Sequence, residues 1–230
     1  MVNKRFTAPA VVTGFPDLWR GYFPEATIVA DDEVLALEPH AHDLVIHGLS
    51  LHWANDPVTQ LFQCGQALVP DGMFMGVTYA GQTLAELRAV LAETETEMTG
   101  GLSPRVLPMI EIRNLGSLLQ MAGFALPVAD AALRNVTYRD IFALMRDLRA
   151  MGEGNALCRR AGPTPRSLFE RADQKYADAF SKNGRISATF EMVFLTGWAP
   201  HESQPKPLKP GSATARLADF LGDGKSELPD

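Results

Sequence analysis

Residues 43–79 read DLVIHGLSLHWANDPVTQLFQCGQALVPDGMFMGVTY and contain a strand, a helix and a second strand in succession. The apolar run at 43–53, which ends in Leu-His-Trp, predicts a buried strand. Asp56 followed by Pro57 is typical of a helix N-cap and first helical position. The nearly all-apolar run at 73–79 predicts a strand covered on both faces. A unit of this kind predicts parallel strands joined by a right-handed crossover.

The same alternation of strands and helices continues on both sides of this unit, and predicts an open, largely parallel α/β sheet. We expect a single domain over residues 1–213, with a helical insertion at about 140–182 and a tail at 214–230. The other expected strands are 9–12, 26–32, 125–130, 133–138 and 188–198, and the other expected helices are 15–23, 83–98, 112–124, 140–151, 167–180 and, in the tail, 216–221.

The composition of the 230-residue chain limits the classes of function. Its hydrophobic fraction of 46% suits a globular domain with a real core. A net charge of -6 argues against a nucleic-acid partner. No segment approaches the roughly 18 apolar residues of a membrane span, and we expect no signal peptide. The cysteines, Cys64 and Cys158, are far apart and predict neither a disulfide framework nor a zinc site, so a reducing cytoplasm is the expected location.

The Leu-His-Trp sequence at the end of the first strand has two interpretations. Ligands of open α/β sheets bind beyond the carboxyl ends of the strands, where we expect His52 and Trp53 to lie. A histidine there can exchange a proton near neutral pH, and a tryptophan can stack on a planar ligand. Alternatively, Trp53 caps the core and His52 bonds to a backbone carbonyl.

Further motifs link the chain to a known family. The stretch 43–88 resembles the carboxyl-terminal half of class I S-adenosylmethionine-dependent methyltransferases. It is most similar to the branch with the biotin-pathway malonyl-carrier methyltransferases and the mitochondrial complex I assembly factor of methyltransferase fold. The motifs that resemble the assembly-factor group and its bacterial relatives are GGLSPRVLPM (100–109), LLQMAGFALPVAD (118–130), LMRDLRAMGEGNAL (144–157) and GWAPHESQPKPLKPGSA (197–213).

This resemblance implies a Rossmann-like class I methyltransferase fold with an antiparallel carboxyl-terminal strand, and S-adenosylmethionine as cofactor. It places the carboxylate of Asp31 near the adenine amino group and the backbone amide of Asp32 near the ring. It places His52 and Trp53 at the floor of the pocket, near the methionine end. His47, inside the strand, is typical of a core histidine and is also included among the cofactor-binding candidates.

The chain departs from the family at its amino-terminal end. The glycine loop of the family, Asp/Glu-x-Gly-x-Gly-x-Gly, has no match, and the nearest candidate is Gly14 in VVTGFPDLW. We therefore expect a fold truncated at the N-terminus, without the first strand and helix, and weak cofactor binding. Strand 9–12 would then lie beside strand 43–53, and strand 26–32 beside strand 9–12. Gly14 would replace the glycine loop, and Asp31 or its neighbour would replace the ribose-binding acid.

Two polar segments are candidates for contact with substrate. Glu153 and Asn155 follow a helix that Gly152 or Gly154 can end, so they either cap the helix or hold a substrate arginine or amine. His201 begins a polar, proline-rich loop that either contacts a substrate or partner, or packs as a surface tail. The loop is not HExxH, and we expect no metal site.

Two hypotheses of function follow. The first is an S-adenosylmethionine-dependent enzyme in which His52, Glu153 and His201 contact the substrate, a protein or small molecule. The complex I relatives imply an arginine of a respiratory-complex subunit, modified by hydroxylation. The second is a cofactor-free, degenerate methyltransferase fold that acts as a binding or assembly factor. A homodimer could cover the open sheet edge.

Overall fold

The computed structural model describes residues 4–155, 157 and 164–205. The chain divides into two compact units, Met1–Pro200 and His201–Asp230. The expected domain limit at residue 213 and the expected helix at 216–221 lie outside the described residues. Within the described ranges, no helix combines the length and the apolar character needed to cross a membrane.

The elements are β1 (Pro9–Thr13), α1 (Pro16–Tyr22), β2 (Thr27–Val29), β3 (His42–Gly48), the 3₁₀ turn η1 (Leu51–Trp53), α2 (Pro57–Ala67), β4 (Leu68–Tyr79), α3 (Ala85–Thr99), α4 (Ile112–Met121), β5 (Ala125–Tyr138), α5 (Ile141–Ala150), α6 (Arg166–Phe180), β6 (Ser181–Lys182) and β7 (Arg185–Trp198).

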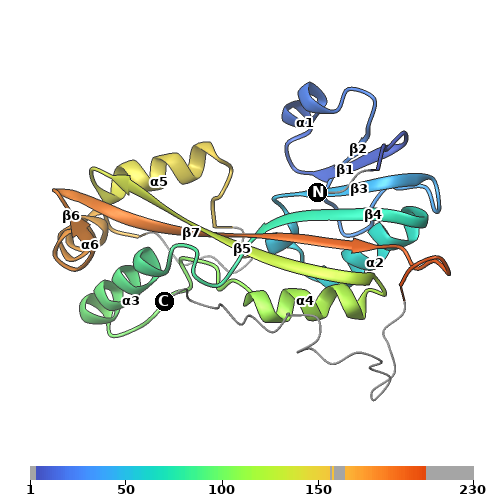
Figure 1. Ribbon diagram of the computed structural model, residues 1–230. Helices are drawn as coiled ribbons and strands as arrows, with labels where there is room; N and C mark the ends of the chain where they lie inside the picture. The colour runs from blue at the N-terminus through green and yellow to red at the C-terminus, as the bar shows by residue number, and fades with distance from the viewer. Residues whose placement is uncertain (1–3, 156, 158–163, 206–230) are drawn as a thin grey trace, which may run out of the picture. The chain divides into compact units, whose positions relative to one another are not determined.

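The strands form one sheet in the order β2-β1-β3-β4-β7-β5, and the short β6 pairs with β7 (Figure 1). Strands β1 to β4 pair in parallel. Strand β7 is antiparallel to both β4 and β5, so β5 points the same way as β4. The predicted fold class, a mostly parallel α/β sheet with an antiparallel carboxyl-terminal strand, is confirmed.

The expected neighbours of the first strand are also confirmed. In β1, Ala10 lies opposite Thr27 of β2 on one side and Val45 of β3 on the other. The first strand of this chain is therefore directly hydrogen-bonded to the strand that leads to Leu-His-Trp.

The predicted strand 43–53 is too long. Strand β3 ends at Gly48, and Leu51–Trp53 forms a 3₁₀ turn. The break has a backbone cause, because Leu49 has a φ of 55°, which is incompatible with a continuing strand. Its N–H still donates to the carbonyl of Val77 at 2.9 Å, so the chain leaves the sheet only after Leu49.

The two strands expected at 125–130 and 133–138 are one strand, β5. Its register with β7 runs without interruption from Val128 to Tyr138. The alanines between the two expected strands carry no turn signal, and a long antiparallel partner keeps them extended.

The start of the second predicted helix is confirmed, and its end is earlier than expected. The side chain of Asp56 accepts a hydrogen bond from the N–H of Thr59 at 3.0 Å, and Pro57 begins α2. The helix ends at Ala67 rather than at the following Pro-Asp-Gly, because Leu68 already pairs with β3.

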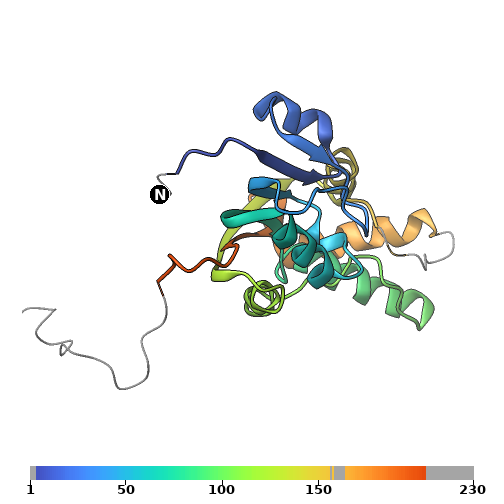
Figure 2. The same cartoon turned by 90° about the vertical axis from the view of Figure 1, so that its right-hand side faces the viewer.

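Two clusters of buried side chains support this arrangement. Helices α2 and α4 pack against β3, β4 and the second half of β7, around Phe74, Leu119 and Leu195. Helices α3, α5 and α6 pack around the first half of β7, with Tyr176 and Ile186 at the centre. Figures 1 and 2 show α3 and α6 side by side, away from α1.

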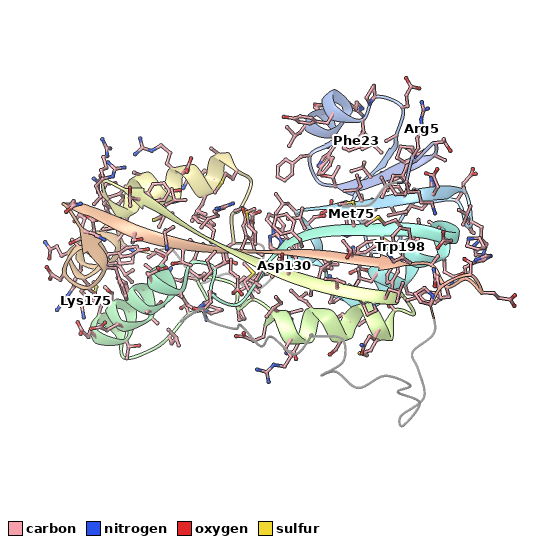
Figure 3. The ribbon with its side chains drawn as sticks, viewed as in Figure 1. Arg5, Phe23, Met75, Asp130, Lys175 and Trp198 are labelled. Atoms are coloured by element: carbon pink, nitrogen blue, oxygen red, sulfur yellow. The ribbon has the colours of Figure 1, made fainter. Side chains whose placement is uncertain are left out.

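Part of the opposite sheet face remains exposed. Met75 on β4, Phe194 on β7 and Val128 on β5 are 42%, 43% and 57% exposed. Figure 3 labels one residue on each of these strands: Met75 on β4, Asp130 on β5 and Trp198 on β7.

Candidate functional site

A cavity of about 530 Å³ lies beyond the carboxyl ends of β3 and β4. Its size falls in the range of about 300–1,000 Å³ that is usual for ligand pockets. Its walls come from η1, the end of β4, helices α3, α5 and α6, and the loops that follow α3 and α5. Its polar lining includes His52, Trp53, Tyr79, Arg105, Arg149, Glu153 and Asn155.

A carboxylate in contact with two ring nitrogens forms the polar end of this cavity. Glu153 Oε2 lies 3.1 Å from His52 Nε2 and 3.2 Å from Trp53 Nε1. The two nitrogens also contact each other closely. The side chain of Glu153 is 13% exposed and that of His52 is 3% exposed. Among the described residues no donor bonds to Glu153 Oε1, so this oxygen is free to accept from a ligand.

Contacts around the imidazole define its orientation. His52 Nδ1 lies 3.4 Å from Thr78 Oγ1, and the ring packs edge-on against Tyr79 with centroids 5.2 Å apart. If Nε2 carries the proton and donates to Glu153, Nδ1 can accept from the Thr78 hydroxyl. Burial, and then the charge of Glu153, raise the pKa of Tyr79, so its phenol stays protonated at neutral pH.

The backbone at the end of α5 places Glu153 in the cavity. Gly152 has a φ of +79°, the left-handed conformation expected for a helix stop, and the N–H of Glu153 donates to the carbonyl of Leu148 at 2.8 Å. A Cβ on Gly152 would lie 2.7 Å from the ring of Phe15. The left-handed conformation therefore favours glycine immediately before the carboxylate, and a larger residue would also displace the exposed ring of Phe15.

A buried ion pair fixes another wall of the cavity. Arg105 donates to the two oxygens of Glu95 at 2.6 and 3.1 Å and to Thr164 Oγ1 at 2.7 Å. The Arg105 bonds, assisted by the N–H of Ser103, lower the pKa of Glu95 to about 2. The pair joins α3 to the loop after it and, through Thr164, to the segment that precedes α6.

A second group of candidates lies at the carboxyl ends of β1 and β2. A Cβ on Gly14 would lie 3.5 Å from Asp31 Oδ1, so the bare backbone of Gly14 adjoins this carboxylate. Gly14 and Asp32 are exposed, and Asp31 is partly exposed.

Gln60 of α2 connects this second group to β3. Its Nε2 donates to the carbonyls of Asp31 at 3.3 Å and Asp32 at 3.0 Å, and its Oε1 lies 3.1 Å from His47 Nε2. His47 is fully buried, and burial lowers its pKa to about 4 despite the opposing effects of the Gln60 bond and the Asp31 charge. His47 Nδ1 has no hydrogen-bond partner among the described residues.

The indole of Trp19 covers the end of β3. A Cβ on Gly48 would lie 2.5 Å from this ring, so the glycine allows α1 to approach the sheet. Trp19 also stacks on Phe23, with ring centroids 6.0 Å apart.

Comparison with known proteins identifies relatives of the whole described unit. No family model matches the chain. It is 38% identical over 203 residues to the mitochondrial arginine-hydroxylase NDUFAF5 of Danio rerio, a match that covers 88% of this chain and 63% of that protein. It is 32% identical over 181 residues to the malonyl-acyl-carrier-protein O-methyltransferase of Methylovorus sp. (strain MP688), covering 78% of this chain and 59% of that one.

A solved structure agrees at the level of the fold. The crystal structure of a protein from Bacillus halodurans C-125, described as a candidate methyltransferase, matches with a TM-score of 0.54 and 12% identity over 86% of this chain and 95% of its own. The chain therefore has the Rossmann-like methyltransferase fold. This methyltransferase-like protein spans about three fifths of the length of the two curated relatives described above. Both relatives are named as enzymes.

In this methyltransferase-fold protein the predicted residues form two groups. His52, Trp53 and Glu153 line one cavity although the first and last are 101 positions apart in sequence. Asn155 also lines it, and donates to the carbonyl of Pro104 at 3.1 Å. His201 belongs to the second unit, where its Nδ1 lies 2.7 Å from Ser203 Oγ.

Gly14, Asp31, Asp32 and His47 form the other group, connected through Gln60 as described above. The roles assigned to these residues, and to those of the cavity, stay predictions.

Several residues that build the site were not among those predicted from the sequence. Gln60 has a signal that could have revealed it, because it lies on the buried stripe of α2 with Leu61 and Cys64. Tyr79 ends an apolar strand on the ligand side. The pairing of Arg105 with Glu95 has no signal in the sequence, since it depends on how the loop after α3 folds back. Among the described residues no group of three or more histidines, cysteines and acids is arranged to hold a metal ion.

Proposed function

We propose that this protein binds S-adenosylmethionine and modifies the guanidinium group of an arginine in a protein substrate. The observation that carries this proposal is the carboxylate of Glu153, with one oxygen bonded to His52 and Trp53 and the other free. A planar guanidinium is a strong partner for such a carboxylate. The name of the arginine-hydroxylase relative supports the same substrate group.

The residues at the strand ends are compatible with the adenosine part of the cofactor. The carboxylate of Asp31 can accept hydrogen bonds from the ribose hydroxyls, and Gly14 beside it has no side chain to obstruct the sugar. Gln60 holds the backbone of Asp31 and Asp32 through two carbonyl bonds. When bound, S-adenosylmethionine supplies a methyl group on a positively charged sulfur.

The cavity residues would position the substrate and exclude water. His52 and Trp53 fix one oxygen of Glu153, which leaves the other to orient the guanidinium. Thr78 and Tyr79 in turn hold the imidazole of His52. The apolar walls strengthen the charge pairing, because water is displaced from the pair.

The family resemblance extends this proposal to the protein that carries the arginine and to the cellular location. We assign the arginine to a subunit of a respiratory complex, and we place the protein in the cytoplasm. A homodimer, formed along the exposed edge of β2 (Thr27–Val29), is a further proposal.

The test measures cofactor binding and arginine modification separately. S-adenosylmethionine is titrated into the purified chain by calorimetry. Arginine peptides are incubated with chain and cofactor in air, with and without a two-electron reductant that balances the insertion of one oxygen atom from dioxygen, and are analysed by mass spectrometry. We expect weak but saturable binding below millimolar cofactor, and a mass gain of one oxygen or one methylene on the arginine that is absent in the matched lysine peptide. Absence of binding at millimolar cofactor, or modification of a malonyl-carrier carboxylate in place of arginine, would overturn the proposal.

A further inference from the structure

The cavity is much larger than the guanidinium group that Glu153 would bind. Its volume of about 530 Å³ is typical of pockets that enclose a drug-sized ligand, whereas an arginine side chain is far smaller. Most of the remaining wall is apolar. The apolar residues that line it are Leu84, Leu87, Leu91, Val106, Leu107, Met109, Met145, Leu148, Phe169 and Phe190.

The other charges on the wall do not provide a second polar subsite inside the cavity. Arg105 is already bonded to both oxygens of Glu95 and to Thr164, and its side chain is only 15% exposed. Arg149 lines the cavity from the exposed surface of α5. A ligand that fills the cavity therefore meets the free oxygen of Glu153 and the hydroxyl of Tyr79 at one end, and a mostly apolar wall elsewhere.

We propose that the cavity recognises an arginine together with a bulky apolar group, so that the substrate is a protein segment in which a large aliphatic or aromatic side chain neighbours the modified arginine. This inference rests on the proposed function and adds its specificity. The guanidinium pairs with Glu153, and the apolar neighbour occupies the compartment between α3, α5 and α6. Burial of that neighbour supplies binding energy that the guanidinium alone lacks.

A series of n-alkylguanidines measures the two parts of the site independently. Methyl-, butyl- and octylguanidine are titrated into the chain by calorimetry. Each buried methylene is expected to raise affinity by roughly threefold to fourfold, until the compartment is full. An affinity that does not depend on chain length would overturn the inference.

Two valine variants locate the effect. Val106→Phe fills part of the cavity and is expected to flatten the increase of affinity with chain length. Val128→Phe adds the same bulk on the exposed sheet face, where Val128 is 57% exposed, and is expected to leave the increase unchanged. If Val128→Phe alone alters the increase, the chains bind to the sheet face and the inference is wrong.

A third variant keeps the test decisive if Val106→Phe does not fold. Phe169→Leu enlarges the compartment and is expected to shift the preferred alkyl chain to a greater length. An unchanged preference in a folded Phe169→Leu protein would count against the compartment as the binding site.

Glu153→Gln separates this inference from the proposed function. This variant is expected to lower the affinity for all the alkylguanidines by a similar factor, and to preserve the dependence of affinity on alkyl chain length. If chain length matters and Glu153→Gln has no effect, the apolar compartment stands and guanidinium recognition fails. If Glu153→Gln weakens binding but chain length has no effect, guanidinium recognition stands and the inference about the apolar neighbour fails.

Peptides test the same dependence on the substrate class itself. Two arginine peptides are compared, one with leucine and one with alanine beside the arginine, and we expect the leucine peptide to bind more tightly.

Discussion

The two groups of site residues are built differently. At the ends of β1 and β2, Asp31 adjoins Gly14 and is held mainly through its backbone carbonyl by Gln60. In the cavity, the carboxylate of Glu153 itself is bonded to two rings and is largely buried. A buried, oriented carboxylate is prepared for a specific cation, whereas an exposed one provides a weaker contact. The difference suggests that this chain is more specialised for its substrate than for its cofactor.

The largest expected effect tests the cavity half of this comparison. Glu153→Gln preserves the shape of the side chain and removes its charge, so we expect a loss of about 100-fold in kcat/KM on an arginine peptide. The affinity for S-adenosylmethionine should stay within twofold, as measured by calorimetry. Glu170→Gln on the exposed surface of α6 is the matched control. Full activity of Glu153→Gln would show that the carboxylate does not recognise the substrate.

The next effect concerns the contact between α1 and the strand ends. In Gly48→Ala the new methyl group would lie 2.5 Å from the ring of Trp19, and we expect a loss of about 2 kcal/mol in the free energy of unfolding. Urea denaturation measures it. Gly21→Ala, where no atom lies within 4 Å, is the control and should be neutral or slightly stabilising. Equal stability of Gly48→Ala and wild type would mean that α1 is free to move away.

Acid sensitivity is expected at His47, the buried histidine of the group at the ends of β1 and β2. The folded pKa of His47 is about 4, below its ordinary value of 6.5, because burial disfavours the charged ring. The unfolded chain therefore binds more protons below pH 6.5, and stability is lost as the pH falls from about 6.5 to 4. We expect a loss of roughly 3 kcal/mol from this residue.

Denaturation curves at several pH values measure this loss, and His47→Gln should reduce the slope in that range whatever its effect at neutral pH. The charges of Asp31 and His52 influence this titration in opposite directions. A slope that is identical in wild type and variant would assign the acid sensitivity to other groups.

The smallest expected effect tests the cofactor half of the comparison. Asp31→Asn should lower the affinity for S-adenosylmethionine about fivefold, because a neutral amide replaces a charged acceptor at a partly solvated site. Asp32→Asn is the matched control and should change the affinity by less than twofold, since we assign its backbone amide, not its side chain, to the adenine ring. A larger loss in the Asp32 variant would reverse the two assignments.

The residues that the sequence predicts correctly are those whose signal is local. Asp56 and Pro57 predict the start of α2, and Gly152 predicts the end of α5. The apolar runs predict β1, β3 and β4. The predicted strand at 43–53 failed at Leu49, since a positive φ in a leucine has no signature in an apolar run. The prediction of two strands in place of β5 was wrong because pairing with the long strand β7 keeps the alanines between them extended.

What the sequence by itself determined is the alternation of elements, because it depends on residues that are near neighbours along the chain. The order of the first strands was implied by the family motifs. Only the tertiary structure decided that Glu153 would meet His52 and Trp53. It also decided that Gln60 would connect His47 to the backbone of the strand ends, and that Arg105 would be neutralised by Glu95. These contacts join segments brought together by packing around β7, and their partners are chosen by geometry and burial that no single segment encodes.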